Sequence, residues 1–322
     1  MSRYVALRLF QIVPMLWAVG TALFVLLHLT PGGPIVALTG EFAGPDTVAA
    51  IESRLGLDRP LHEQYVRFLA LLARGDLGES YFYKAPVLDV VLSHLPATLV
   101  LVAPALLLAA LFGIPMGIFA ARGRHVGTGL LVLSLLAFAV PVFWLGHLLR
   151  LAFSVELGWF PIHGMVDARA DPTGLAYGLD VAHHAALPVL TLTLHQLAFT
   201  MLLTRSAMIF ERRRPYFVTA LMKGNSLWRA ESRHALPNGS LSIVTLFANR
   251  IGWFMAGALL IEIVYGWPGL GQLANGATRN RDYPLVIGIV LAVTLVTLMA
   301  NLAADVLYMW IDPRVRPGER RA

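Results

Sequence analysis

Long apolar stretches separated by short polar segments dominate the pattern of this chain. A helix needs about 20 residues to cross the roughly 30 Å hydrocarbon core of a membrane. Six stretches approach or exceed that length, at residues 9–29, 98–121, 127–149, 185–203, 241–264 and 285–311. The first is too long for the core of a signal peptide, and no small-x-small cleavage site follows it, so we interpret it as a retained helix. The pattern predicts an all-α polytopic membrane protein with about six transmembrane helices.

The distribution of lysine and arginine predicts which helix ends face the cytoplasm. With six spans, both termini, the turn after the second span and the loop between the fourth and fifth spans share one side. That side holds fifteen Lys and Arg residues, against eight on the other side. An excess of these residues marks the cytoplasmic side. Both termini are therefore predicted to be cytoplasmic, and the region between the first two helices to be extracytoplasmic.

These assignments divide the chain into four parts. Residues 1–29 form an N-terminal transmembrane helix, 30–95 an extracytoplasmic region, 96–312 a five-helix core with a cytoplasmic loop at 208–240, and 313–322 a cytoplasmic tail. Within 30–95, apolar residues from Leu61 to Leu72 recur at helical spacing and predict an amphipathic helix that ends near Gly75. Residues 267–269 predict a tight turn after the fifth helix.

The composition supports a membrane protein and excludes several enzyme classes. The 322 residues are 57% hydrophobic and 14% charged, whereas soluble domains carry about 25% charge. The net charge of +6 is explained by the topology, so nucleic acid is not an expected partner. The chain lacks cysteine, and neither Lys84 nor Lys223 follows a glycine, which excludes a phosphate-binding loop. We expect no catalytic residue, no metal site and no cofactor in this chain.

The segment 216–239 is polar, although it lies between two apolar stretches. Pro215 suits the first turn of a helix, and Phe217, Ala220, Leu221 and Gly224 follow at i, i+3, i+4 and i+7. This spacing predicts a short cytoplasmic helix with an apolar docking face, ended by Gly224 in the left-handed conformation. Pro237 marks a later break. An ordinary basic loop is the alternative that these features leave open.

This loop resembles the signature of bacterial ABC importer permeases, E-A-A-x3-G-x9-I-x-L-P. The residues in register are Ala220, Gly224, Leu236 and Pro237. Val218, Thr219 and His234 depart from it. The dipeptide, oligopeptide and nickel branch departs in a similar way, and "TALMKG" is similar to its T-A-R-A-K-G, with Leu221 at the arginine. The stretches "RLGLDRPLHEQYVRFLALLARGDLGESY", "IEIVYGWPGLGQL" and "DVLYMWIDPRVR" resemble further segments of that branch.

The resemblance implies a non-enzymatic permease of the bacterial inner membrane, which forms half of a translocation pathway and works by alternating access. The implied partners are a second homologous permease, two cytoplasmic ATPase subunits that bind ATP and Mg, an extracytoplasmic solute-binding protein and membrane lipid. The loop helix would dock on an ATPase, and the residues assigned to this coupling are Phe217, Thr219, Ala220, Leu221, Lys223, Gly224, Leu236 and Pro237. Dipeptides or oligopeptides are the expected solutes, with nickel or metal chelates and glutathione-like molecules as alternatives.

Polar residues inside apolar spans are costly, so they are candidates for the translocation pathway. These are His195, Gln196, Asn249 and Arg250. One hypothesis is that Arg250 attracts an anionic group such as a peptide carboxylate. The alternative is that it pairs with Asp305, Glu262 or the partner permease. A secondary transporter is the alternative class of protein, but the paired repeats that such proteins usually carry are not found.

Overall fold

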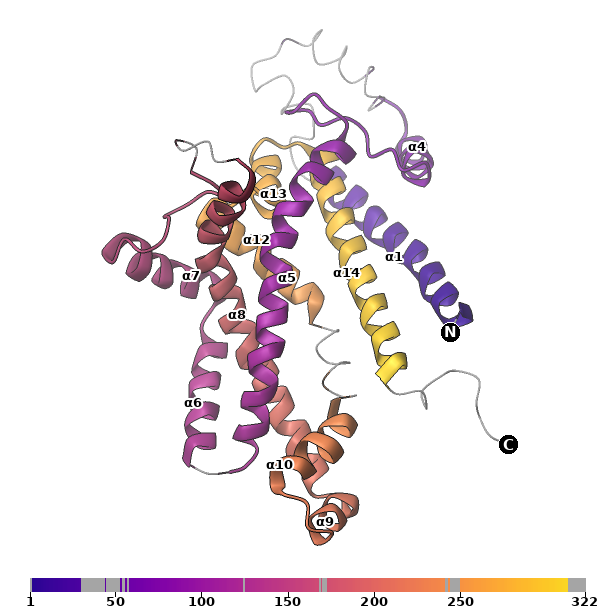
Figure 1. The fold of residues 1–322 in the computed structure, drawn as a ribbon. Coiled ribbons are helices and arrows are strands. Elements are labelled where there is room, and N and C mark those ends of the chain that lie inside the picture. The colour runs from indigo at the N-terminus through magenta and orange to yellow at the C-terminus, as the bar shows by residue number, and fades with distance from the viewer. Residues whose placement is uncertain are drawn as a thin grey trace. The chain divides into compact units, whose positions relative to one another are not determined.

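The computed structural model describes residues 2–29, 44, 53, 56, 58–123, 125–167, 169, 173–240, 243 and 250–311. Within them the regular elements are helices, and an isolated antiparallel bridge joins Glu79 and Pro86. The predicted all-α class is therefore confirmed. In chain order the helices are α1 (Ser2–Leu29), α4 (Leu61–Ala73), α5 (Val87–Ala120), α6 (His125–Ala139), α7 (Val142–Arg150), the π-helical η1 (Leu151–Glu156), α8 (Gly174–Arg212), α9 (Pro215–Met222), α10 (Leu227–Ala230), the π-helical η2 (Glu231–Ala235), α12 (Ile251–Tyr265), α13 (Leu270–Arg279) and α14 (Tyr283–Ile311) (Figure 1).

Four of the described helices are long and apolar enough to cross a membrane, namely α1, α5, α8 and α14. The number rises to six if two broken pairs, α6 with the α7–η1 segment and α12 with α13, each count as one span. The six predicted stretches fall on these elements, although most of the segment 241–249 lies outside the described residues. The multi-pass architecture is therefore confirmed, with four to six spans.

The predicted third span, 127–149, is not one continuous helix. It divides into α6 and α7, and the axis bends by 98° between residues 127–139 and 142–156. The break falls at Pro141, which precedes α7 with extended backbone angles of φ −58° and ψ 133°. A proline disfavours helical geometry in the residue before it and lacks the N–H that would continue the helix. Hydropathy alone could not place this bend, because the residues on both sides are apolar.

The predicted fourth span, 185–203, is the middle of a much longer helix. Helix α8 has 39 residues and is about 58 Å long at 1.5 Å per residue, roughly twice the hydrocarbon thickness. Its first eleven residues, 174–184, lie between the predicted third and fourth apolar stretches. Helical hydrogen bonding satisfies the backbone in water as well as in lipid, so the apolar run marks the membrane-embedded part and not the helix ends.

The chain divides into two compact units, of which unit 1 comprises residues 97–268 and those from 299 onward. In unit 1, helices α5 and α8 approach closely through Gly113 and Gly117. A Cβ atom at Gly117 would lie 2.5 Å from the Cβ of Thr204, and one at Gly113 would lie 2.9 Å from the Cβ of Thr200. Small residues four apart allow helix backbones to pack this closely in membranes. The two helices are therefore in direct backbone contact over at least one turn.

Helix α12 of unit 1 ends at a glycine. Gly266 has φ +60°, and the N–H of Trp267 donates to the carbonyl of Glu262 at 2.8 Å. This is the hydrogen bond of a left-handed helix cap. The fully buried Trp267 donates its indole N–H to the carbonyl of Ala97 at 2.8 Å. The turn predicted at 267–269 is confirmed, and it ties the end of α12 to α5.

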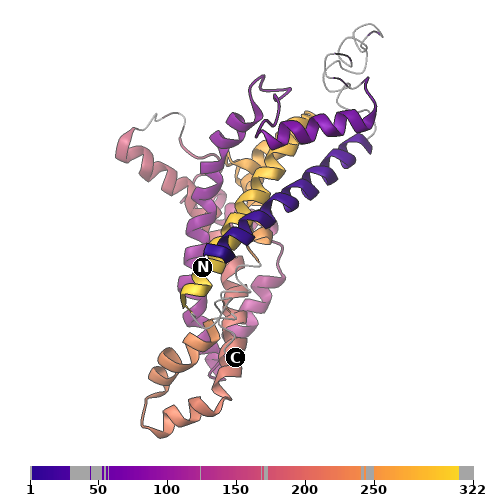
Figure 2. The same ribbon diagram turned by 90° about the vertical axis from the view of Figure 1, so that its right-hand side faces the viewer.

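Unit 2 comprises residues 2–96 and 269–298. The predicted amphipathic helix is confirmed as α4, and Gly75 follows it with φ +74°. Helices α1 and α4 meet near the end of α1, where Thr21 and Tyr65 share a hydrogen bond of 2.8 Å and His28 contacts Gln64 at 3.1 Å (Figure 2). These two contacts fix α4 against the last turns of α1.

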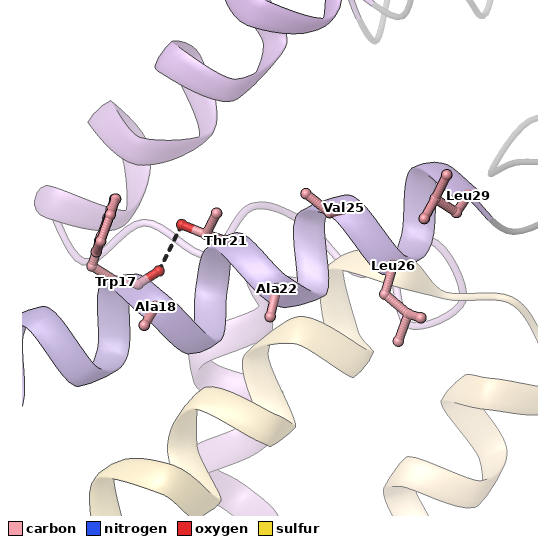
Figure 3. Close-up of a pocket in the computed structure, with 7 residues that line it drawn as sticks. All are labelled: Trp17, Ala18, Thr21, Ala22, Val25, Leu26 and Leu29. Atoms are coloured by element: carbon pink, nitrogen blue, oxygen red, sulfur yellow. Dashed lines mark hydrogen bonds between the residues drawn. The ribbon is translucent and has the colours of Figure 1, made fainter.

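Helix α1 also lines an open apolar groove within unit 2. Its lining residues are Trp17, Ala18, Thr21, Ala22, Val25, Leu26 and Leu29 (Figure 3). The Thr21 hydroxyl, the polar side chain of this set, donates to the carbonyl of Trp17 at 2.8 Å within the helix. A surface of this composition suits apolar neighbours and offers little to a charged solute.

A buried carboxylate organises the start of α14 in unit 2. Asp282 is fully buried and accepts hydrogen bonds from the Ser80 hydroxyl at 2.6 Å and the Phe82 N–H at 3.0 Å. It also accepts from the N–H of Leu285 at 3.3 Å, as a helix-capping residue does. One side chain therefore joins the segment 79–86 to the beginning of α14.

Candidate functional site

The predicted coupling loop folds as a helical hairpin at one end of unit 1. Figures 1 and 2 both place α9 and α10 beyond the ends of α5 and α8. Helix α9 begins at Pro215, as predicted from the freedom of proline in a first helical turn. Gly224 follows with φ +81°, and its N–H donates to the carbonyl of Leu221 at 2.9 Å. The predicted helix and its glycine end are confirmed.

Two residues of the predicted docking face of α9 are buried inside the chain. Phe217 and Ala220 are 4% and 6% exposed, because they pack inside the chain. They belong to an apolar cluster with residues of α5, α8, α10 and η2, namely Ile118, Ala121, Met208, Ala230 and Ala235. The i, i+3 spacing correctly identified an apolar stripe, but that stripe faces the protein's own core. Phe217 and Ala220 therefore hold the loop in place.

The outward side of α9 carries the accessible groups. Val218, Leu221 and Met222 are 48%, 37% and 84% exposed. Thr219, Lys223 and Gly224 are also exposed. On α10, Leu227 and Trp228 are 42% and 51% exposed. We call this set of five apolar residues, Val218, Leu221, Met222, Leu227 and Trp228, the outer patch.

A buried ion triad anchors the hairpin to α5 and α8. Glu231 is fully buried and accepts hydrogen bonds from Arg122 Nη2 and Arg212 Nη2, each at 2.6 Å. Arg122 Nε donates to the same carboxylate at 3.2 Å. Arg212 Nη1 also donates to the carbonyl of Ala121 at 2.7 Å. The triad thus joins the loop segment η2 to the ends of both α5 and α8.

A second polar contact fixes the start of α9. The Tyr216 hydroxyl donates to Glu211 at the end of α8. Partial burial, the hydrogen bond to Glu211 and the charge of that carboxylate together raise the pKa of Tyr216 to about 12. Tyr216 is therefore neutral at physiological pH, and its hydroxyl keeps the proton that it donates to Glu211.

The remaining coupling residues, Leu236 and Pro237, lie after η2. Leu236 is partly buried and packs on the apolar cluster, and Pro237 is exposed. The predicted break at Pro237 is wrong, because residues 236–240 are helical. The wide π-helical turn of η2 ends at Ala235, two residues before Pro237, and such a turn relieves the clash between a proline ring and the carbonyl one turn earlier.

The candidate pathway residues lie where α6, α8 and α12 meet. The Arg250 guanidinium carbon lies 4.3 Å from the ring centroid of Phe199 and 5.4 Å from that of Phe138. The His195 ring stacks on Phe138 with centroids 5.7 Å apart. Gln196 is 3% exposed, and Asn249 lies outside the described residues. Three of the four predicted residues are thus placed, and His195 and Arg250 share one aromatic cluster.

The expected ion partners of Arg250 are not found beside it. Glu262 follows it by twelve residues, or about 18 Å along the helix axis, and is out of reach. In the described part of the chain, Arg250 takes part in no ion pair, including one with Asp305. The intramolecular pair is therefore wrong for these residues, whereas a pair with the partner permease stays open.

Sequence reasoning missed the ion triad. Arg122 and Arg212 were counted as topology markers, and Glu231 received no role. A signal existed, since Glu231 is the sole acidic residue between Arg212 and Ser240. A lone acid in a basic segment is a candidate for a structural ion pair, but its partners are 109 and 19 residues away, so the sequence could not identify them.

Comparison with known proteins assigns the whole chain to one family. Residues 113–317 match the family described as "Binding-protein-dependent transport system inner membrane component", and residues 1–102 match its N-terminal part. The di/tripeptide transport system permease protein DppB of Pseudomonas aeruginosa is 36% identical, with 98% of this chain and 99% of the relative aligned. The glutathione transport system permease protein GsiC of Salmonella paratyphi A is 34% identical over the same shares. A putative peptide transport system permease protein of Brucella abortus is 35% identical, again over 98% and 99%.

Proposed function

The chain belongs to the binding-protein-dependent transport system inner membrane components, the permease subunits of ABC importers, and we propose that it forms half of an ATP-driven pathway for short peptides. The observation that carries this proposal is the loop hairpin, which presents an apolar outer patch while its inner side is locked to α5 and α8. A loop whose basic residues only marked the cytoplasmic side of the membrane would need neither the exposed apolar patch nor the fixed inner side.

The outer patch is the proposed contact with a cytoplasmic ATPase subunit. Exposed apolar residues gathered on one surface are typical of protein–protein interfaces. Thr219, Lys223 and Gly224 lie around this patch and complete the proposed contact. ATP and Mg would be bound by the ATPase subunits, because the chain itself lacks a phosphate-binding loop. When the ATPase pair closes, a displacement of α9 would reach the membrane helices through the ion triad and the apolar cluster.

The proposed orientation follows from the same assignment. The hairpin and both termini would face the cytoplasm, where the ATPases work. The segments around α4 and residues 157–173 would then face outward and meet the solute-binding protein. A second permease would complete the pathway. The excess of Lys and Arg on the hairpin side supports this orientation.

Di- and tripeptides are the proposed solutes. Two relatives are named for di/tripeptide and peptide transport, and a third is named for glutathione, itself a small peptide-like molecule. Glutathione is the second candidate on that ground. The shared chemistry is a short chain with a free carboxylate and amide groups.

The test is co-purification of the tagged chain from its native membrane, followed by ATP-dependent uptake in proteoliposomes. Met222→Glu places a charge in the outer patch, and Leu175→Glu is its matched control, because the two residues are 84% and 82% exposed and lie at opposite ends of the α8–α9 segment. We expect the ATPase subunits to be lost with Met222→Glu and retained with Leu175→Glu. Uptake of a labelled tripeptide driven by an ion gradient without ATP would refute the importer and favour a secondary transporter.

A further inference from the structure

Arg250, which directly precedes α12, lies in an aromatic setting drawn from two helices of unit 1, α6 and α8. Its guanidinium carbon is 4.3 Å from the ring centroid of Phe199 on α8 and 5.4 Å from that of Phe138 on α6. The two rings are themselves 6.2 Å apart, and His195 stacks on Phe138 with an angle of 17° between the ring planes. The guanidinium is thus held by ring faces, which attract a cation but do not neutralise it.

The position of Arg250 in a predicted membrane span raises the question of what its positive charge binds. Arg250 directly precedes α12, and about 24 Å of helix separates it from Gly266 at 1.5 Å per residue, so it lies far from the Gly266 end and inside the predicted apolar stretch 241–264. No carboxylate of the described residues forms an ion pair with it. Ionisable residues inside spans face partners, cavities or solute pathways. Among the described residues, the arginine therefore has no carboxylate counter-ion.

The same cluster is partly exposed at the surface of the chain and contains a second polar group. Arg250 is partly exposed, Phe138 is 36% exposed, and Trp253, about one turn beyond Arg250, is 75% exposed. The Nδ1 atom of His195 is buried and has no hydrogen-bond partner among the described residues. An imidazole nitrogen can donate to an anion or accept from a neutral group. The cluster thus combines a cation, a free polar atom and apolar ring surface.

We infer that Arg250, His195, Phe138 and Phe199 form a binding site for the carboxylate group of the transported solute. This inference rests on the proposed function, since the free carboxylate is the anionic group that every short peptide carries at its C-terminus. The planar guanidinium matches a carboxylate with two parallel N–H···O bonds, and the remaining ring surface suits an apolar side chain. Asn249 lies outside the described residues and is not used in this inference.

The experiment uses the full importer, with the partner permease, the ATPases and the solute-binding protein, in proteoliposomes. Labelled trialanine and trialanine C-terminal amide are the two probes, and the measured quantity is the ratio of their ATP-dependent uptake rates. The same binding protein serves every variant, so its own preference cancels when ratios are compared. The ratio is also independent of how much complex assembles. Arg250→Gln removes the charge, Arg250→Lys retains it, and Arg279→Gln is an exposed control with the same chemical change.

We expect Arg250→Gln to lower the ratio by about tenfold or more, because a hydrogen bond to a charged group is worth at least one decade in affinity. Arg250→Lys should retain most of the preference, and Arg279→Gln should leave it unchanged. An unchanged ratio in Arg250→Gln would overturn the inference. If the partner permease were also lost from that complex, the arginine would instead pair with an acid of that subunit. Absence of ATP-dependent uptake of both probes by the wild type would overturn the proposed function itself.

Discussion

Replacing Glu231 by glutamine tests whether the ion triad holds the loop hairpin in place. Glutamine has the same size, but it offers one acceptor oxygen and brings an NH₂ group toward two arginines that already donate. Glu231 is 0% exposed, whereas the side chains of Arg122 and Arg212 are 24% and 19% exposed. The carboxylate is therefore desolvated and the two cations are partly hydrated.

The expected loss of local stability follows from this burial. Removing one member of a buried ion pair costs about 3–5 kcal/mol, because the remaining charge is uncompensated. Partial hydration of both arginines places the change at the lower end, about 3 kcal/mol. At about 1.4 kcal/mol per decade, the population of the locally open hairpin should rise about a hundredfold.

Hydrogen–deuterium exchange of the purified complex measures this quantity segment by segment. We expect peptides covering residues 215–240 to exchange about a hundredfold faster in Glu231→Gln, and peptides from α7 and α12 to be unchanged. Glu63→Gln is the matched control, because the Arg59–Glu63 pair is 3.8 Å long with side chains 61% and 48% exposed and such pairs contribute at most about 1 kcal/mol. Equal effects of the two variants, or unchanged exchange at 215–240, would refute the role of the triad.

Two further predictions concern packing and titration. Gly117→Ala should destabilise the detergent-purified chain by about 2 kcal/mol, because the added methyl group overpacks against Thr204. The control is Gly129→Ala, whose methyl group meets open space, so it should have no effect or stabilise the chain slightly. The thermal unfolding midpoints of the two variants are compared. Burial, and secondly the charge of Asp282, raise the pKa of Tyr81 from the ordinary value of 10.0 to about 12. This residue should therefore stabilise the fold below pH 10 and lose that contribution as the pH rises through 12. Asp282→Asn should lower the pKa of Tyr81 without returning it to 10.0, as ultraviolet titration of tyrosinate against a Tyr81→Phe background can measure; an unchanged pKa would contradict the electrostatic cause.

The sequence predicted the elements of this fold better than their continuity. Apolar length located α1, α5 and α14, and proline and glycine located both ends of α9. It overlooked the bend at Pro141 and the polar ends of α8, because hydropathy reports the solvent around a helix and not its hydrogen bonding. The burial of Phe217 and Ala220 inside the chain was missed for a related reason. A stripe at i, i+3 identifies a buried side, but whether the cover is a partner or the chain itself depends on tertiary structure.

The arrangement of the hairpin also explains why a buried ion triad stands where a well-packed set of apolar residues could fold as well. A well-packed apolar replacement often matches or exceeds the stability of a buried ion pair, so stability alone is a weak reason for Glu231. The carboxylate instead joins three chain segments through directional bonds, at the ends of α5, α8 and η2. Because Gly113 and Gly117 bring α5 into backbone contact with α8, these two helices resist separate movement. A displacement of α9 would therefore move both helices together. A permease needs such joint movement if its membrane helices are to move with an ATPase.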